Sequence, residues 1–367
     1  MMNLLVFNLA TDDHDPILGF TTLWLNKLAE KASRIHVITM RSGALKLREN
    51  ITVYSLGKEF GYSEPRRAIR FYRFLYEILR SQSIDLCFSH MTPIFTNLAA
   101  PILNVLGIPI VTWYAHPSLT NNLKLAHHFS ARMVTSIPTA YPYRSDKLVV
   151  VGQGIDTDLF APLSNCFTDK ITAHNLRDQY PLILAVGRLS PVKDYGTLIS
   201  AVGHLISQTS QPMKLLIVGN PTNAQDEIYV QSLYTQVQQL NLESVVTFQP
   251  AVSMYELPEI YRRCTVYVNL TPTGFGDKVA LEAMACGKVC LAANTGFRET
   301  LGIYAEQLLF THANPQDLAQ KLVAILELEE KQRQIMGDYL RQQIIKYHSL
   351  DRLIQNLLQL FQQLTYA

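Results

Sequence analysis

Residues 271–302, TPTGFGDKVALEAMACGKVCLAANTGFRETLG, join a glycine-containing turn, a helix and a strand in one short unit. In the turn, Gly274-Phe275-Gly276 lets backbone N–H groups approach a ligand closely. The helix that we expect from about Asp277 directs the positive end of its dipole to the same place. Gly287 ends that helix, and the apolar residues after it predict a short buried strand over 289–293. The segment therefore predicts an α/β fold with a turn that fits an anion such as a diphosphate.

Glu282 stands within the predicted helix among valine, alanine, leucine and methionine residues. A carboxylate in such apolar surroundings needs a hydrogen-bonding partner. Beside a diphosphate the natural partners are ribose hydroxyls, so Glu282 is a candidate ligand-binding residue. The alternative is a packed helix residue, whose substitution would leave nucleotide affinity unchanged.

A second segment, PLILAVGRLSPVKDYGTLISAV at residues 181–202, repeats this organisation with different chemistry. The apolar run 182–186 predicts a buried parallel strand, and a helix is expected after the loop that follows. Arg188 and Lys193 lie in that loop, at the carboxyl end of the strand, where open α/β sheets bind ligands. Two cations there suit a diphosphate. Taken alone, the segment is better explained as an ordinary loop with two solvated cations, and only its pairing with the first segment favours a site.

Together the two segments resemble the donor half of glycosyltransferases with the GT-B fold, specifically the large retaining family 4. Members of that family carry a GRL…K loop whose cations neutralise the donor diphosphate, which implies this role for Arg188 and Lys193. They also carry a LEAMACG motif whose glutamate, here Glu282, holds the ribose. The resemblance covers most of the chain, and its further matching segments are LIVG (216–219), VTFQ (246–249) and VVVGQGIDTDLFAP (149–162).

The resemblance implies an α/β protein with two Rossmann-like doubly wound domains that face one another across a cleft. It also implies a nucleotide diphosphate sugar as co-substrate, with no cofactor and no metal ion. The pattern Asp156-Thr157-Asp158 matches the family linker rather than a metal motif at a strand end. The implied donor-binding residues are Gly274, Phe275, Gly276, Asp277, Lys278 and Glu282.

One departure concerns a first glutamate, which family members carry eight positions before the second and which contacts the transferred sugar. In this chain that spacing falls on Gly274, whereas alignment on Gly-Phe-Gly places Thr273 there. Asp277 or Lys278 is then an additional residue. We expect altered sugar contacts rather than loss of activity, with Asp277 either replacing the missing carboxylate or interacting with the helix dipole.

Length and composition favour two domains in a nearly neutral protein. The 367 residues exceed what one core supports, 48% of them are hydrophobic, and the formal net charge is +2. That charge argues against nucleic acid as a partner. The five cysteines show no metal-binding spacing, which fits a reducing cytoplasm. We expect an N-terminal acceptor-side domain of residues 1–162, joined by a helix at 348–367, and a C-terminal donor domain of residues 163–347.

Alternating strand and helix patterns in the first half predict a doubly wound sheet. Residues 91–115 carry no charge and resemble a membrane span, but their three prolines favour a buried helix followed by a strand. No secretion signal is expected before the first strand. The expected strands are 4–8, 35–39, 84–89, 108–113, 133–136 and 147–151, and the expected helices are 20–31, 66–80 and 96–106.

The loop 12–19 follows the first predicted strand, where a loop that faces a ligand should lie. Asp13 and His14 suggest polar contacts to an acceptor, and Gly19 permits a close approach to the next helix. The alternative is a solvated turn rich in aspartates that cap that helix. We give the two interpretations equal weight.

Two histidines also follow predicted strands. A lone histidine is usually structural. His116 follows the strand 108–113, however, and its position resembles that of the family histidine that lines the cleft near the transferred sugar, which implies a catalytic role. His90, at the end of the strand 84–89, is a weaker candidate of the same kind.

The helix 66–80 is expected to place arginines along one face and apolar or aromatic residues along another. Such a helix can lie on anionic lipid, and lipid-linked acceptors in the family favour peripheral contact with the inner face of the membrane. The alternative, which we favour slightly, is an ordinary helix that packs its apolar stripe on the sheet.

The sequence thus predicts a cytoplasmic, retaining, metal-independent glycosyltransferase, of the hexosyltransferase kind, that acts on a hydroxyl acceptor. The acceptor is a glycan, a lipid-linked compound or a small molecule. A nucleotide-sugar epimerase of GT-B architecture would need further acids and bases, and a glycan phosphorylase a pyridoxal-type lysine, neither of which stands out. A catalytically silent nucleotide-sugar-binding subunit is the alternative from another class.

Overall fold

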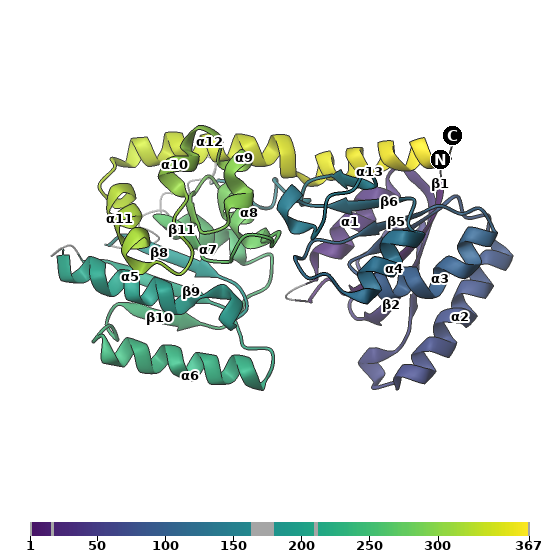
Figure 1. Ribbon diagram of the computed structural model, residues 1–367, viewed down its shortest axis with the longest axis horizontal. Coiled ribbons are helices and arrows are strands. Elements are labelled where there is room, and N and C mark those ends of the chain that lie inside the picture. The colour runs from purple at the N-terminus through teal and green to yellow at the C-terminus, as the bar shows by residue number, and fades with distance from the viewer. Residues whose placement is uncertain (1, 16–17, 163–179, 209–211, 366–367) are drawn as a thin grey trace. The chain divides into compact units, whose positions relative to one another are not determined.

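The computed structural model describes residues 2–15, 18–162, 180–208 and 212–365. The chain divides into two compact units, one formed by Met1–Gly154 with Leu350–Ala367 and the other by Ile155–Ser349. Among the described residues, each unit contains one parallel sheet whose strands are connected by helices (Figure 1). This architecture confirms the expected α/β fold of doubly wound type.

Seven strands form the sheet of the first unit in the order β3-β2-β1-β4-β5-β6-β7. The chain adds strands on one side of β1 and then crosses to the other side, so the topological switch point lies between β1 and β4. The strands are β1 (Met2–Thr11), β2 (Ala32–Ser42), β3 (Ile51–Ser55), β4 (Leu86–His90), β5 (Ile110–Trp113), β6 (Arg132–Thr135) and β7 (Leu148–Val150). The helices are α1 (Phe20–Ala29), α2 (Glu64–Ser81), α3 (Pro93–Val105), α4 (Asn121–Phe129) and α13 (Leu350–Thr365).

Helices cover both faces of this sheet. Successive residues of β1 point to opposite faces, so Leu4 and Val6 pack with α1 and α13, whereas Leu5 and Phe7 pack with α2 and α3. Burial on both faces explains why β1 is apolar at nearly every position instead of alternating. The last helix, α13, is the yellow end of the chain in Figure 1 and packs against α1.

Five strands form the sheet of the second unit in the order β10-β9-β8-β11-β12, which places its switch point between β8 and β11. The strands are β8 (Leu182–Val186), β9 (Lys214–Val218), β10 (Val246–Gln249), β11 (Val266–Asn269) and β12 (Val289–Ala292). The helices are α5 (Tyr195–Gln208), α6 (Ala224–Gln239), α7 (Leu257–Arg263), α8 (Lys278–Ala285), α9 (Arg298–Leu301), α10 (Ala305–Leu308), α11 (Pro315–Leu326) and α12 (Glu330–His348).

The boundary between the units lies earlier than the sequence suggested. Ile155 donates its N–H to the carbonyl oxygen of His348 at 2.8 Å, and Arg341 donates to the carbonyl oxygen of Phe160 at 2.9 Å. These bonds attach the residues after Gly154 to the second unit. We expected the donor domain to begin at residue 163, and residues 163–179 lie outside the described residues.

The uncharged stretch at 91–115 forms the helix α3 and the strand β5, as its prolines suggested. Across the ranges that the structure describes, no helix combines the length and the apolar character needed to cross a membrane.

Candidate functional site

The switch point of the second unit brings together the two segments that the sequence singled out. Arg188 and Lys193 follow β8, and the turn that leads into α8 follows β11. β8 and β11 are hydrogen-bonded neighbours in the sheet. Their carboxyl ends therefore open at one place, which is where open α/β sheets bind ligands.

Two glycines bring the loops after β8 and β9 into close contact. A side chain at Gly219 would place its Cβ 1.9 Å from the carbonyl oxygen of Gly187, so the two backbones touch. Gly187 has a φ of 145°, and a Cβ there would lie 3.1 Å from Cε of Lys193. The hydroxyl of Tyr195 donates to the carbonyl oxygen of Gly187 at 3.0 Å. The lysine stem thus lies directly over a fixed backbone turn.

Lys193 is held by a carboxylate from the opposite side of the switch point. Its Nζ lies 2.5 Å from Oδ2 of Asp277 and donates to the hydroxyl of Thr271 at 3.3 Å. The same carboxylate oxygen accepts hydrogen bonds from Thr271 Oγ1 and from Asn269 Nδ2, the latter at 2.7 Å. A compact polar cluster therefore joins the end of β8 to the end of β11.

The carboxylate of Asp277 is ionised in this cluster. Burial by itself would raise the pKa of Asp277, but the charge of Lys193 and the hydrogen bonds from Lys193, Thr271 and Asn269 outweigh burial and lower it. Asp277 occupies the N-cap position of α8, yet its side chain makes no capping hydrogen bond. The side chain of Asp277 therefore does not cap the helix. The first turn of α8 keeps backbone N–H groups that lack an intrahelical partner.

Arg188 faces a different carboxylate. Its Nε lies 3.8 Å from Oδ2 of Asp226, and its side chain is 46% exposed. Asp226 is buried and also accepts hydrogen bonds from the N–H and the hydroxyl of Thr222, at 3.0 and 2.7 Å. The guanidinium is consequently the more accessible of the two candidate cations, since the side chain of Lys193 is 16% exposed.

The turn before α8 is fastened to the end of β12. Gly274 has a φ of 107°, which favours glycine, and Asn294 donates to the carbonyl oxygen of Phe275 at 2.7 Å. Thr273, which alignment on Gly-Phe-Gly would place at the expected first glutamate, lies in this turn. Its hydroxyl lies 2.9 Å from that of Thr295 and accepts the N–H of Thr295 at 3.0 Å.

Glu282 is buried in α8 and has two partners inside the protein. Its Oε1 pairs with Nζ of Lys278 at 2.9 Å, and its Oε2 accepts the hydroxyl of Tyr261 at 3.1 Å. Burial, followed by the charge of Glu282, raises the pKa of Tyr261, so its hydroxyl stays protonated. An ionised carboxylate has about four acceptor positions, so these two bonds leave capacity for a ligand hydroxyl.

The chemistry of this site is that of an anion-binding site. It combines cationic side chains that follow β8 with a glycine turn and a helix N-terminus that follow β11. Within the described ranges no group of three or more His, Cys, Asp or Glu side chains could hold a metal ion. Both sequence segments thus meet in space, and the candidate residues Arg188, Lys193, Gly274, Phe275, Gly276, Asp277, Lys278 and Glu282 lie in one unit.

Sequence reasoning missed several residues of this cluster. Asn269 is the last residue of β11, a strand that the sequence analysis did not assign. Thr271 follows β11, and Asn294 follows β12. The apolar run VYVNL immediately before the glycine turn was the available signal for β11. Tyr261, on α7, could not be paired with Glu282 without the fold.

At the switch point of the first unit, His90 is a core residue. It is 3% exposed, its ring lies against Trp24 with centroids 4.7 Å apart, and Nδ1 lies 3.4 Å from Oδ1 of Asn8. Burial lowers the pKa of His90 to about 3, so the ring is neutral. His90 is therefore not open to solvent as an acceptor contact.

The loop after β1 is tied to its own unit. Asp13 is buried, accepts the hydroxyl of Thr22 at 3.1 Å and lies 3.7 Å from Nζ of Lys46. His14 is exposed. Gly19 is the N-cap of α1 with a φ of −54°, so it uses no conformation that requires glycine. Two residues of this loop, 16–17, lie outside the described residues.

His116 is exposed in the loop after β5, at the carboxyl end of the sheet. Its Nδ1 accepts the N–H of Ser118 at 3.1 Å, which leaves Nε2 as the nitrogen that carries the proton in the neutral ring. Partial burial lowers the pKa of His116. Its position thus agrees with the expected strand end.

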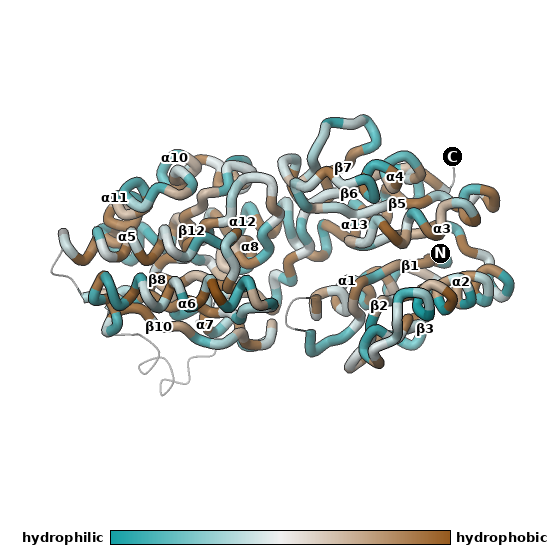
Figure 2. The backbone as a smooth tube through the Cα atoms, turned by 60° about the horizontal axis from the view of Figure 1, so that its bottom comes forward, coloured by the Kyte–Doolittle hydropathy of each residue, from teal (hydrophilic) through white to brown (hydrophobic). Residues whose placement is uncertain are grey.

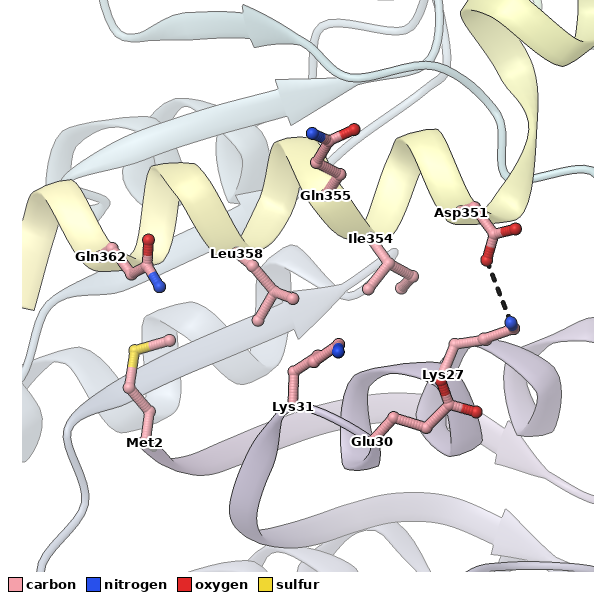
Figure 3. A pocket seen from close by; sticks show the side chains of 9 residues that line it. All are labelled: Met2, Lys27, Glu30, Lys31, Asp351, Ile354, Gln355, Leu358 and Gln362. Carbon is pink, nitrogen blue, oxygen red and sulfur yellow. Dashed lines mark ion pairs between the residues drawn. The ribbon is translucent and has the colours of Figure 1, made fainter.

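A groove of about 390 Å³ lies elsewhere, between α1 and α13 (Figure 3). Met2, the first residue of β1, lines it, so it lies at the amino end of the sheet. Lys27 and Asp351 form an ion pair of 3.0 Å beside it. The groove is consequently separate from the strand ends at which the candidate residues lie.

These observations define the class of protein. Two doubly wound α/β units, one of which gathers cationic side chains and a glycine turn at its switch point, form the GT-B fold. Residues 167–343 match the family described as glycosyl transferases group 1.

Related proteins agree with this assignment. The D-inositol 3-phosphate glycosyltransferase of Stackebrandtia nassauensis is 32% identical over 163 residues, 42% of this chain and 35% of that protein. The enzyme of the same name from Gordonia bronchialis is 32% identical over 203 residues, 54% and 42% of the two chains. This chain therefore matches less than half the length of these relatives. An uncharacterized glycosyltransferase of Methanocaldococcus jannaschii is 25% identical over 88% of this chain and 89% of that protein.

Solved structures share the fold at low sequence identity. HepE of Anabaena, solved with UDP and glucose, is 19% identical and has a TM-score of 0.77 over 99% of this chain and 100% of its own. Sucrose-phosphate synthase of Thermosynechococcus elongatus is 17% identical, with a TM-score of 0.75 and 99% coverage of both chains.

Proposed function

We propose that this chain is a retaining glycosyltransferase of the family 4 type that transfers a sugar, a hexose, from a nucleoside diphosphate sugar to a hydroxyl acceptor. The observation that carries the proposal is the meeting of Lys193, Arg188 and the N-terminus of α8 at the switch point of the second unit. The domain match supports the reaction class. HepE, which shares the fold, has been solved with UDP-glucose, which supports the donor class.

The proposed site acts mainly on the leaving group. Negative charge builds on the diphosphate as its bond to the sugar breaks, and Arg188, Lys193 and the N–H groups of the glycine turn stabilise that charge. These groups do what a metal ion would otherwise do, so we propose that the reaction needs none. Glu282 accepts ribose hydroxyls with its remaining acceptor capacity. His116, from the first unit, is proposed to contact the sugar.

A screen of nucleotide sugars tests this proposal. The chain is incubated with UDP, GDP and ADP sugars, and the release of nucleoside diphosphate is measured with and without simple glycoside and lipid-linked acceptors. We expect release from one donor class, accelerated by an acceptor, and a product that keeps the anomeric configuration of the donor. Transfer with inverted configuration would contradict the retaining assignment alone.

A catalytically silent nucleotide-sugar-binding subunit is the second candidate, and one observation favours it. Alignment on Gly-Phe-Gly places Thr273 at the position of the first glutamate, and its hydroxyl lies 2.9 Å from that of Thr295. Asp277, the nearest acid, is engaged by Lys193. Tight nucleotide binding without release from any donor would establish this candidate and exclude the enzyme.

We further propose that α2 contacts an anionic membrane on which a lipid-linked acceptor lies. Its exposed face mixes apolar residues with arginines, because Ile69 is 71% and Tyr76 is 64% exposed beside Arg73 and Arg80. Hydrophobic and hydrophilic residues alternate along α2 in Figure 2. We expected the arginines of this helix to share one face, but Arg70 is half-buried and donates to the carbonyl oxygen of Ser55 at 2.8 Å.

Vesicle sedimentation tests the membrane surface. Variants Ile69→Ser and Tyr76→Ser should lose binding to vesicles that contain phosphatidylglycerol while their thermal unfolding is unchanged, since both side chains are exposed. Equal sedimentation of the unaltered chain and both variants would contradict the proposal.

A further inference from the structure

Each cationic side chain of the proposed anion site lies beside a carboxylate of the protein itself. Lys193 pairs with Asp277 at 2.5 Å, Lys278 with Glu282 at 2.9 Å, and Arg188 lies 3.8 Å from the carboxylate of Asp226. Three positive side chains thus face three negative ones. A ligand phosphate that uses one of these cations must share it with a carboxylate.

The contact between Lys193 and Asp277 is the tightest of the three and lies at the switch point itself. Both side chains are largely buried, with exposed fractions of 16% and 10%. Low exposure weakens solvent screening, so a second negative group next to Asp277 is repelled more strongly than at a surface. The carboxylate therefore opposes any phosphate that approaches Lys193.

Resting on the proposed function, we infer that Asp277 is an internal competitor of the donor phosphate and thereby determines the affinity of the site for phosphorylated ligands. In the structure its carboxylate occupies one donor position of the Lys193 ammonium, which has three. A diphosphate must take over this position or bind beside the carboxylate. Asp277 thus weakens the binding of nucleoside diphosphate, which favours its release after transfer.

The hydrogen bonds of Asp277 allow a substitution that removes its negative charge but keeps its contacts. Hydrogen bonds from Lys193, Asn269 and Thr271 converge on one oxygen of Asp277, Oδ2. An asparagine can place its carbonyl oxygen there, accept from the same donors and remove only the charge. Asp277→Asn is therefore the informative substitution. Asp194→Asn is the matched control, because Asp194 follows Lys193 in the same loop but its carboxylate lies 3.9 Å from Nε2 of His312.

Titration calorimetry of the full chain tests the inference, with UDP, GDP, ADP, inorganic pyrophosphate and the uncharged nucleosides as probes. Asp277→Asn should bind the preferred nucleoside diphosphate and pyrophosphate on the order of tenfold more tightly, because one repelling charge is removed. Binding of the nucleoside alone should not change, and Asp194→Asn should behave like the unaltered chain. A tighter complex that weakens as salt is raised would agree with an electrostatic gain.

Three outcomes would overturn the inference, and they differ in what else they affect. Unchanged or weaker diphosphate binding in Asp277→Asn, with normal binding by the unaltered chain, contradicts the inference alone. An equal gain for the uncharged nucleoside shows a change in shape rather than in charge, and also contradicts it. Absence of diphosphate binding in every variant contradicts both the inference and the proposed function.

Discussion

At Gly219 a single hydrogen in place of a methyl group allows the loops after β8 and β9 to meet. A Cβ there would lie 1.9 Å from the carbonyl oxygen of Gly187, which is backbone and cannot move aside as a flexible side chain can. The same contact fixes the turn over which Lys193 lies. Stability and the geometry of the site are therefore coupled at this residue.

Gly219→Ala should lower the free energy of unfolding by about 3 kcal/mol, because the added methyl group forces backbone shifts in a packed region. Gly203→Ala is the matched control. Gly203 lies within α5, and a Cβ there meets its nearest neighbour at an ordinary 3.5 Å, so alanine should stabilise the helix by about 0.5–1 kcal/mol. Urea denaturation of both variants checks the pair, and equal stabilities would contradict the close approach.

Glu282→Gln should reduce the affinity for nucleoside diphosphate by about 1.5–3 kcal/mol, because a neutral amide accepts ribose hydroxyls less strongly than a carboxylate. The variant retains an acceptor for Tyr261 but loses the charge that pairs with Lys278. Calorimetry with the nucleoside diphosphate and with pyrophosphate separates the effects, since pyrophosphate has no ribose. If Glu282 is only a packed residue, the two probes will be affected alike.

Several helices and strands could be predicted from local sequence patterns. The strands β8 and β10 and the starts of α5 and α8 coincide with their predictions, because apolar runs, a glycine turn and a charged first turn mark them. β3 and β11 were missed, because ITVYS and VYVN are runs of only five and four residues. The face of α2 could not be assigned, because its tyrosines and Ile69 point outward while Phe71, Leu75 and Ile78 are buried.

The contacts of the site residues could not be predicted from the sequence either. Lys193 and Asp277 were each singled out, but their pairing across 84 positions of sequence depends on β8 and β11 being neighbours. His90 was expected at a strand end and lies there, yet the aromatic rings of α1 and β5 that enclose it were not foreseeable from spacing.

At the end of α12, His348 should make the stability of the protein depend on pH. Burial lowers the pKa of His348 from 6.5 to about 4, and its Nε2 lies 2.9 Å from the hydroxyl of Thr300. Because the unfolded chain takes up a proton below pH 6.5 and the folded one does not, stability should be complete above pH 6.5 and fall as pH decreases toward 4. The loss is at most about 1.4 kcal/mol per pH unit for this residue.

Urea denaturation between pH 4 and 8 measures this dependence. His348→Gln keeps a polar group near Thr300 but removes the titrating ring, so its stability should fall less steeply in acid. His204→Gln, on α5, should keep the slope of the unaltered chain. Parallel curves for all three proteins would show that His348 is not responsible.

For the whole molecule, the proposed chemistry requires that the donor diphosphate be neutralised by side chains. Activity on the preferred donor should therefore survive an excess of EDTA, roughly tenfold over any trace metal. The reason is that cationic side chains and backbone amides supply the charge stabilisation. Loss of activity that magnesium or manganese restores would show that the leaving group is stabilised by a metal ion.

The binding of nucleoside diphosphate to the second unit tests the central claim most directly. Calorimetry with UDP, GDP and ADP should show one that binds the unaltered chain, and Lys193→Ala and Arg188→Ala should each weaken that binding by about 2–3 kcal/mol while circular dichroism shows a folded protein. His204→Ala, away from the loop after β8, provides the control. No binding of any nucleotide, or binding that both loop variants leave unchanged, would contradict the assignment of the site.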